Sequence, residues 1–329
     1  MYKKMSSSKV KIGSVFLLMI SIFTLINPVV FAKELKNDNV IDNISLENSE
    51  IYMNGKTKIT VTFSEKPDNK ILGGDTITLD LPPELVGYEG TIKLSEFGEA
   101  VIKSNKIIVT FNENASNKEH IKGDFTFTVK SISQVENDSQ IQVPMDLGTG
   151  LPVPYLTIKG YPSSSGDDGD REPTPFSYKG GESDTANPEL IKWYIVVNPN
   201  SLSVSDQVIL SDTLGVGQNL LRDSFEINGL SISEFENANY GKVNFSEDNF
   251  TLTINKEYID KKSISLTYKT KINDQGKSLK ELENNFVVSY QEEGKEPTSL
   301  AGRGTAVNDI SQDGKAEGDD SLPNESDTT

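Results

Sequence analysis

Apolar and polar residues alternate along the chain from residue 33 onward. Every second position is Ile, Val, Leu or Phe in residues 59–63, 77–81, 107–111 and 125–129, and Thr or Asp fills most positions between them. This period of two is typical of β-strands with one buried face. Turn-forming pairs such as Asn54-Gly55 separate the strands, and no stretch of comparable length keeps a helical period. The pattern predicts an all-β sandwich domain over residues 33–160.

The alternation stops at residues 161–175, whose sequence is YPSSSGDDGDREPTP. Gly, Ser, Pro and acidic residues leave no apolar face there, which predicts an interdomain linker. Asp167, Asp168 and Asp170 could bind Ca²⁺, but their spacing matches no ligand loop for this ion. The favoured interpretation is a solvated acidic loop.

A second set of alternating strands follows the linker. The predicted strands are residues 193–197, 208–212, 250–254, 264–272 and 285–291. In the first of them Trp193 falls on the inward face and Tyr194 on the outward face. We expect a second sandwich over residues 176–311, which ends in a strand-like segment at 303–310.

The N-terminal end has the pattern of an export signal. Four Lys residues precede or enter an apolar stretch at residues 12–26, and Val30-Phe31-Ala32 supplies the small residues of a cleavage site. We therefore interpret residues 1–32 as a cleaved signal peptide rather than a retained membrane anchor. The prediction is an exported protein that is not inserted in a membrane after cleavage.

The C-terminal end, residues 312–329, holds one Leu and no aromatic residue. Such a segment buries too little apolar surface to offset the entropy of ordering, so we predict a disordered tail. Leu322-Pro323 resembles the start of an LPxTG wall-sorting signal, but Glu325 and Ser326 stand where Thr and Gly belong. Wall anchoring would therefore require a longer chain that carries the sorting signal.

Composition narrows the class of protein. The chain has 49 acidic against 32 basic residues and a net charge of −17, so it would repel the phosphates of nucleic acids. It has no Cys, which excludes disulfides and thiolate metal sites. Its single histidine, His120, lies in a predicted polar turn with no nucleophile motif nearby. We therefore predict neither an enzyme nor a bound metal or cofactor.

Two polar residues fall where the alternation places apolar ones. Asp212 is in phase with the inward residues of its strand, and Asn284 precedes Phe286 in the same inward phase. A buried carboxyl or amide costs several kcal/mol unless it is paired. The alternative is that both residues lie at strand ends that water reaches.

Five motifs follow one another in the second domain. They are PFSYKGGE at 175–182, IKWYIVVN at 191–198, VILSDTLGVGQNL at 208–220, SLTYKTKI at 265–272 and ENNFVVSYQEEGKE at 283–296. In this order they resemble the ligand-binding domain of the Gram-positive collagen adhesins, which are MSCRAMM surface proteins. The front domain is similar to the family's first domain through GGDTITLDLP at 73–82 and KIIVTF at 106–111. The resemblance covers residues 36–310 and implies two tandem immunoglobulin-like β-sandwiches of the DEv-IgG type.

The resemblance also implies a spontaneous isopeptide cross-link in the second domain. The family joins a Lys to an Asn with the help of an acid, and the matching residues are Lys179, Asn284 and Asp212. Asn285 is an out-of-phase neighbour and the less favoured partner. Burial would make the amine neutral and the acid protonated, so that the amine attacks the amide while the acid polarises its carbonyl. Ammonia would leave once, without turnover.

The ligand implied by the resemblance is host collagen, with another extracellular-matrix protein as the open alternative. Matching positions for ligand contact are Tyr178, Tyr194, Val196, Glu226 and Thr267, although the last three replace the Asn residues of the collagen binders. The linker would cover the ligand, and residues 303–310 would act as a latch strand that adds to the front sheet. A structural stalk or pilin-like spacer stabilised by the cross-link is the alternative function.

Overall fold

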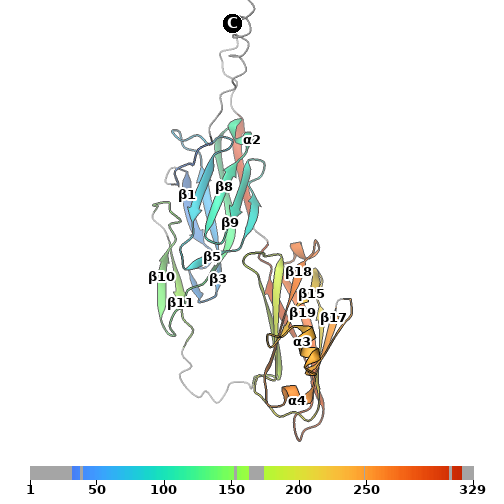
Figure 1. Cartoon of the computed structure of the whole chain (residues 1–329). Helices are drawn as coiled ribbons and strands as arrows, with labels where there is room; N and C mark the ends of the chain where they lie inside the picture. Colours follow the sequence, from blue (N-terminus) through green and yellow to red (C-terminus); the bar gives the residue numbers. More distant parts are fainter. Residues whose placement is uncertain are drawn as a thin grey trace, which may run out of the picture.

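The computed structural model describes residues 32–37, 40–151, 154–162, 174–247, 249–310 and 313–320. Two β-sandwich domains follow each other along the chain, with the second set beside the lower end of the first (Figure 1). The predicted all-β fold is confirmed. The proposed signal peptide lies outside the described residues except for Ala32, as do residues 163–173 of the proposed linker. Among the described residues, none of the helices has the length and apolar character needed to span a membrane.

The front domain contains three sheets. One has the order β1-β3-β9, another β4-β8-β7-β6, and a small third sheet β10-β11-β2. Since β3 pairs along one edge of β9, the strands β5 and β21 share its other edge. The bounds are β1 (Ile41–Leu46), β2 (Glu50–Tyr52), β3 (Lys56–Ser64), β4 (Thr76–Asp80), β5 (Leu85–Gly87), β6 (Gly90–Lys93), β7 (Gly98–Ile102), β8 (Lys106–Phe111), β9 (Lys118–Ser131), β10 (Gln140–Pro144), β11 (Tyr155–Lys159) and β21 (Asp313–Asp320).

The second domain contains two sheets. One has the order β12-β13-β18-β15 and the other β16-β17-β14-β19-β20. The bounds are β12 (Ser177–Ser183), β13 (Leu190–Val197), β14 (Val208–Leu214), β15 (Gln218–Ile227), β16 (Gly241–Phe245), β17 (Asn249–Ile254), β18 (Ile264–Ile272), β19 (Glu281–Tyr290) and β20 (Thr298–Val307). All pairings within these two sheets are antiparallel.

The alternation of residue types produces the two cores. Along β3 every second side chain is buried, and the residues between are only partly covered. The buried residues form one apolar cluster per domain. Trp193 is fully buried in the second core, as its inward phase predicted, whereas Tyr194 is 44% exposed. Helices are short connections: α2 (Glu113–Ser116), α3 (Ile232–Asn237), α4 (Lys256–Ile259) and the 3₁₀ turn η2 (Gly276–Ser278).

The predicted disordered tail is wrong for residues 313–320. This segment forms β21, which pairs antiparallel with β9 of the front domain between Lys118 and Thr126. An isolated strand of this composition would lack the apolar surface to order itself. Here the sheet already exists, so main-chain hydrogen bonds to an open strand edge order the segment. Residues 321–329 lie outside the described residues.

The side chains of β21 suit its position between the two main sheets of the front domain. The residues that face inward are small: Gly314, Ala316 and Gly318. A Cβ at position 314 would lie only 2.5 Å from Cγ2 of Ile92 in β6, so the strand fits because the side chain is absent. The outward residues are charged. Glu317 forms an ion pair with Lys122 at 3.1 Å, and Asp320 forms one with Lys118.

The predicted position of the latch at residues 303–310 is also wrong. Residues 298–307 form β20, which pairs with β19 along its whole length inside the second domain. The strand that reaches the front domain comes after it, as β21. The predicted polar turn around His120 is part of β9 instead, with the ring exposed and Nδ1 3.3 Å from Asp319 of β21. Strand periodicity could not show which segment pairs within the second domain and which reaches the front domain, because both β20 and β21 are β-strands.

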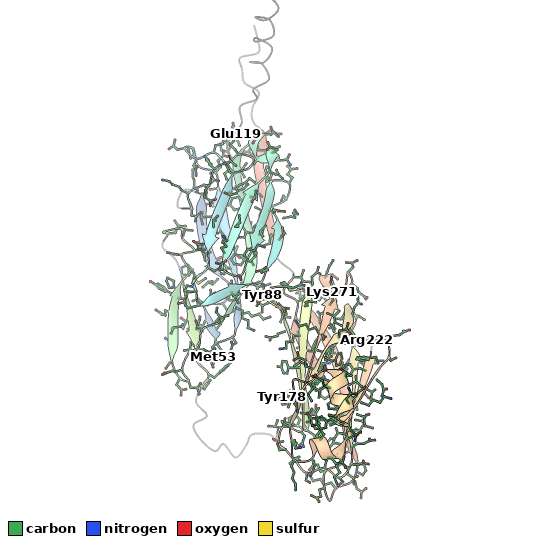
Figure 2. All side chains as sticks on the ribbon, viewed as in Figure 1. Met53, Tyr88, Glu119, Tyr178, Arg222 and Lys271 are labelled. Carbon is green, nitrogen blue, oxygen red and sulfur yellow. The ribbon has the colours of Figure 1, made fainter. Side chains whose placement is uncertain are left out.

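The two domains are fastened directly at their junction. Nζ of Lys56 in β3 lies 2.6 Å from Oδ2 of Asp309, whose side chain is 3% exposed. Lys130 forms an ion pair with Glu182 at 2.9 Å, and the Glu89 N–H donates to the Thr185 carbonyl at 2.8 Å. Figure 2 places Tyr88 at this junction. Burial, together with the nearby charge of Asp309, raises the pKa of its hydroxyl.

Candidate functional site

The polar residues predicted to face inward meet inside the second domain. Lys179 comes from β12, Asp212 from β14 and Asn284 from β19, and the side chains of all three are enclosed between the two sheets. The alternative of strand ends open to water is therefore wrong for Asp212 and Asn284, which are 1% and 0% exposed. Asn285 points outward and is exposed.

The Lys179 ammonium group lies in an aromatic and acidic pocket. Nζ donates to Oδ2 of Asp212 in a short hydrogen bond and to the hydroxyl of Tyr268 at 2.8 Å. Nζ is also 5.1 Å from the centroid of the Trp193 ring. A Cβ at Gly304 would come within 2.7 Å of the Lys179 stem, so the glycine makes room for the long side chain.

Tyr268, on β18, contacts all three residues of the cluster. Its hydroxyl donates to Oδ1 of Asp212 at 2.9 Å and accepts from Nζ of Lys179. It also accepts from Nδ2 of Asn284 at 3.1 Å. The hydroxyl therefore bridges the acid, the amine and the amide.

The amide oxygen of Asn284 has two other donors. The backbone N–H of Gly215 donates to Oδ1 at 3.0 Å, and Nε2 of Gln218 donates to it at 2.9 Å. Asp212 hydrogen-bonds Lys179 and Tyr268, and no bond from Asp212 to the amide is present among the described contacts. The sequence-based expectation that the acid polarises this carbonyl directly therefore differs from the observed geometry.

Burial shifts the pKa values of both members of the pair toward their neutral forms. Desolvation lowers the pKa of Lys179 to about 8, although the charge of Asp212 opposes the shift. Desolvation likewise raises the pKa of Asp212, against the influence of Lys179. Both shifts favour a neutral amine beside a protonated carboxyl, because the low-dielectric interior disfavours charge.

A pH dependence follows for a variant in which Lys179 stays free, such as Asn284→Ala. Between pH 8 and 10.5 the folded state binds fewer protons at Lys179 than the unfolded state, because the folded pKa is lowered. The free energy of unfolding should therefore rise with pH across this window. Urea unfolding at several pH values measures it, with Lys179→Met/Asn284→Ala as the control for other titrating groups. Equal slopes in the two variants would contradict the expectation.

The residues predicted to contact ligand share the outer face of the sheet β12-β13-β18-β15. Tyr178 is directly opposite Val196, and Tyr194 is opposite Thr267, which in turn is opposite Glu226. They form two neighbouring rows on this face, one of Tyr178 and Val196 and the other of Tyr194, Thr267 and Glu226. Tyr178 and Tyr194 are 40% and 44% exposed, and Glu226 is also exposed.

A glycine shapes this exposed face. Gly180 is opposite Tyr194 across the β12–β13 pair, and a Cβ there would lie 2.3 Å from the tyrosine hydroxyl oxygen. The Tyr194 side chain therefore extends flat over β12. Figure 2 shows Tyr178 on the side of the second domain nearest the front domain in this view.

Sequence reasoning missed Tyr268, Gln218 and Gly215 as neighbours of the cluster. Tyr268 and Gln218 are both polar residues in buried positions, which is the signal that identified Asp212 and Asn284. The contact from Gly215 uses the backbone, which residue type does not reveal. Across the parts of the chain that are described, no group of three or more acidic or His side chains is placed to hold a metal ion.

Each of the two domains matches a known protein family. Residues 174–298 match the family model of the collagen binding domain, and residues 50–140 match a bacterial Ig domain. The collagen adhesin of Staphylococcus aureus is 26% identical over 329 residues, with 92% of this chain covered. The chain spans 27% of the length of that relative.

Solved structures give the same result for the two domains together. The Enterococcus faecalis MSCRAMM ACE, described as binding its ligands by the collagen Hug Model, is 28% identical, with a TM-score of 0.67. The match covers 86% of this chain and 99% of that one. The crystal structure of the Staphylococcus aureus collagen adhesin is 25% identical, with a TM-score of 0.72, and the match covers 87% of this chain and 98% of that one.

The fold and these matches define the class of protein as a tandem immunoglobulin-like β-sandwich region similar to bacterial collagen-binding proteins. Within that class, the predicted resemblance to the Gram-positive collagen adhesins is confirmed.

Proposed function

We propose that this chain is the ligand-binding region of a bacterial surface adhesin and that it binds the collagen triple helix. The ligand would lie on the outer face of the sheet β12-β13-β18-β15, across Tyr178 and Tyr194. Collagen is a rod of polyproline II chains rich in Pro, and flat aromatic faces suit such a surface. The single observation that carries the proposal is this pair of exposed tyrosines on one face of the sheet, next to a junction with the front domain.

The position of these exposed tyrosines supports a clamp rather than an open surface. Tyr178 and Glu182 lie on the same face of β12, and Glu182 is already in contact with Lys130 of the front domain. They are four positions apart along the strand, which is about 13 Å. A rod bound over Tyr178 would therefore lie in the angle between the two domains.

The strand β21 supports closure around such a rod. It belongs to the chain that leaves the second domain, yet it pairs with β9 of the front domain. Together with the Lys56–Asp309 ion pair, it would hold the front domain over the ligand. An elongated ligand needs this arrangement because closure, rather than a deep pocket, retains it.

We also propose that Lys179 and Asn284 form an isopeptide bond with Asp212 as the promoting acid. The support is the enclosed cluster in which amine, acid and amide share the Tyr268 hydroxyl. The predicted reaction is a single self-modification that releases one ammonia. It would supply a covalent tie in a chain without Cys.

Binding of residues 33–329 to immobilised collagens tests the ligand proposal. Tyr194→Ala should weaken binding by about 2 kcal/mol, roughly 30-fold, because it removes an aromatic anchor from the centre of the face. Tyr155→Ala, an exposed tyrosine on β11 of the front domain, is the matched control and should bind as the parent does. Surface plasmon resonance gives both dissociation constants.

The alternative of a structural stalk makes the opposite prediction. A spacer would show no saturable binding to any collagen and no difference between the two tyrosine variants. Saturable binding to another matrix protein, with weaker binding by Tyr194→Ala, would support the clamp but identify a ligand other than collagen. Wall anchoring is proposed only for a longer chain that carries a sorting signal.

A further inference from the structure

We propose that the backbone N–H of Gly215 and the side-chain amide of Gln218 form an oxyanion site that activates Asn284 for cross-linking. The inference rests on the proposed isopeptide bond and assigns how its amide is made reactive. The acid would then act on proton transfer, and the two N–H groups on the carbonyl oxygen.

The backbone donor fixes which way the Asn284 amide points. Gly215 N–H can only donate, so the atom 3.0 Å from it must be the oxygen Oδ1. Nδ2 is then directed to the other side, where it donates to the Tyr268 hydroxyl at 3.1 Å. The carbonyl oxygen therefore faces its two donors, while the leaving nitrogen faces the proton relay.

The orientation of Gln218 is fixed as well. Its Oε1 accepts from Nε1 of Trp193 at 3.1 Å and from the hydroxyl of Thr270 at 2.9 Å. Since indole N–H is only a donor, Nε2 must be the end that faces Asn284. The Gln218 side chain is buried, so the surrounding core holds it in place before any reaction.

The two donors already lie 2.9 and 3.0 Å from the amide oxygen of the unreacted Asn284, so both are aimed at the atom on which the oxyanion would develop. Asn284 and Gln218 are buried between the two sheets, so such donors act in a low-dielectric site. The N–H groups are in place before the reaction and need no rearrangement when charge appears on Oδ1.

The step is balanced as follows. The neutral Nζ of Lys179 attacks Cγ of Asn284, a C–N bond forms, and the carbonyl electron pair moves onto Oδ1, which Gly215 and Gln218 hold. Protonated Asp212 supplies a proton through the Tyr268 hydroxyl to Nδ2, and its carboxylate takes a proton from Nζ. The Cγ–Nδ2 bond then breaks, the carbonyl re-forms and ammonia leaves.

The test follows the cross-linking rate of freshly synthesised chains by intact mass, as the loss of one ammonia over time. Gln218→Met removes the donor while keeping the volume, and should slow cross-linking by about 10²- to 10³-fold. Gln218→Glu should also be slow, but its rate relative to the parent should rise as pH falls, because a protonated carboxyl can donate again. Gln275→Glu, at an exposed position outside the cluster, is the matched control.

Trp193 fluorescence and circular dichroism check that each variant folds before its rate is compared. A parent chain that keeps its full mass would overturn the cross-link and this inference together. A cross-linked parent with Gln218→Met at the parental rate would overturn the oxyanion site alone. A rate ratio for Gln218→Glu that does not change with pH would also contradict donation by this side chain and indicate a packing role.

Discussion

Replacing Asn284 by Ala is expected to leave the chain at its full mass and to destabilise the second domain by about 4–5 kcal/mol. The proposed bond between residues 179 and 284 closes a loop of about 105 residues, and a covalent closure of that size disfavours the unfolded state by this amount. The Lys179–Asp212 pair remains in this variant, but the hydrogen bonds of the amide to Gly215, Gln218 and Tyr268 are lost with Asn284 and add to the loss of stability. Urea unfolding followed by Trp193 fluorescence measures it, because the chain has a single Trp and it lies in this core.

Asn285→Ala is the matched control for this prediction. Asn285 is the next residue in β19 but points to solvent, so its removal should keep the ammonia loss and change the unfolding free energy by less than about 0.5 kcal/mol. If Asn284→Ala lost the same stability as Asn285→Ala, the covalent tie would not exist. If only Asn285→Ala kept its full mass, the partner of Lys179 would be the outward residue.

Replacing Gly314 by Val is expected to release β21 from the front domain and to weaken collagen binding by roughly 10- to 100-fold. The new Cβ would be 2.5 Å from Cγ2 of Ile92 and 3.1 Å from the Lys93 carbonyl oxygen, so the strand could not keep its place. Overpacking of this kind costs about 1–3 kcal/mol, and affinity falls with the fraction of closed molecules. Hydrogen exchange of β9 amides between Lys118 and Thr126 reports release, and plasmon resonance reports affinity.

The control for Gly314→Val is Ala301→Val, which adds the same branched side chain type to an exposed position of β20. It should leave both exchange and affinity unchanged. Fast exchange in β9 with unaltered affinity would separate the latch from ligand binding and remove closure from the proposed function. Slow exchange in Gly314→Val would mean that the front domain yields around the new side chain.

Much of the fold was predictable because burial of one face of a strand appears in the sequence as an alternation of apolar and polar residues. The alternation in residues 59–63 and 250–254 directly reports burial on one side of each strand. The order of strands in each sheet was not predictable, because pairing joins residues that are far apart in sequence. The strand β21 was missed for a related reason: its residues are ordered by the edge of β9 and not by any apolar face of their own.

The candidate site was predictable only where a residue broke its local pattern. Asp212 and Asn284 did so, and Lys179 followed from the resemblance to the adhesin family. Tyr268 resembles an ordinary core aromatic residue, and only the structure shows its hydroxyl among three polar groups. Strand phase predicted that Tyr194 faces outward, and its side chain is 44% exposed, whereas Tyr178, Glu226 and Thr267 followed only from the resemblance.

The edge of β9 that receives β21 has a consequence for the open molecule. Without β21, main-chain groups from Lys118 to Thr126 would be unpaired, and such an edge is a template for aggregation. Lys118 and Lys122 lie along it, and their like charges would repel the same edge of a second copy. The acidic residues of β21 attract the same two lysines. Lys118 and Lys122 would thus disfavour pairing of β9 with a second copy and favour pairing with β21 of the same chain.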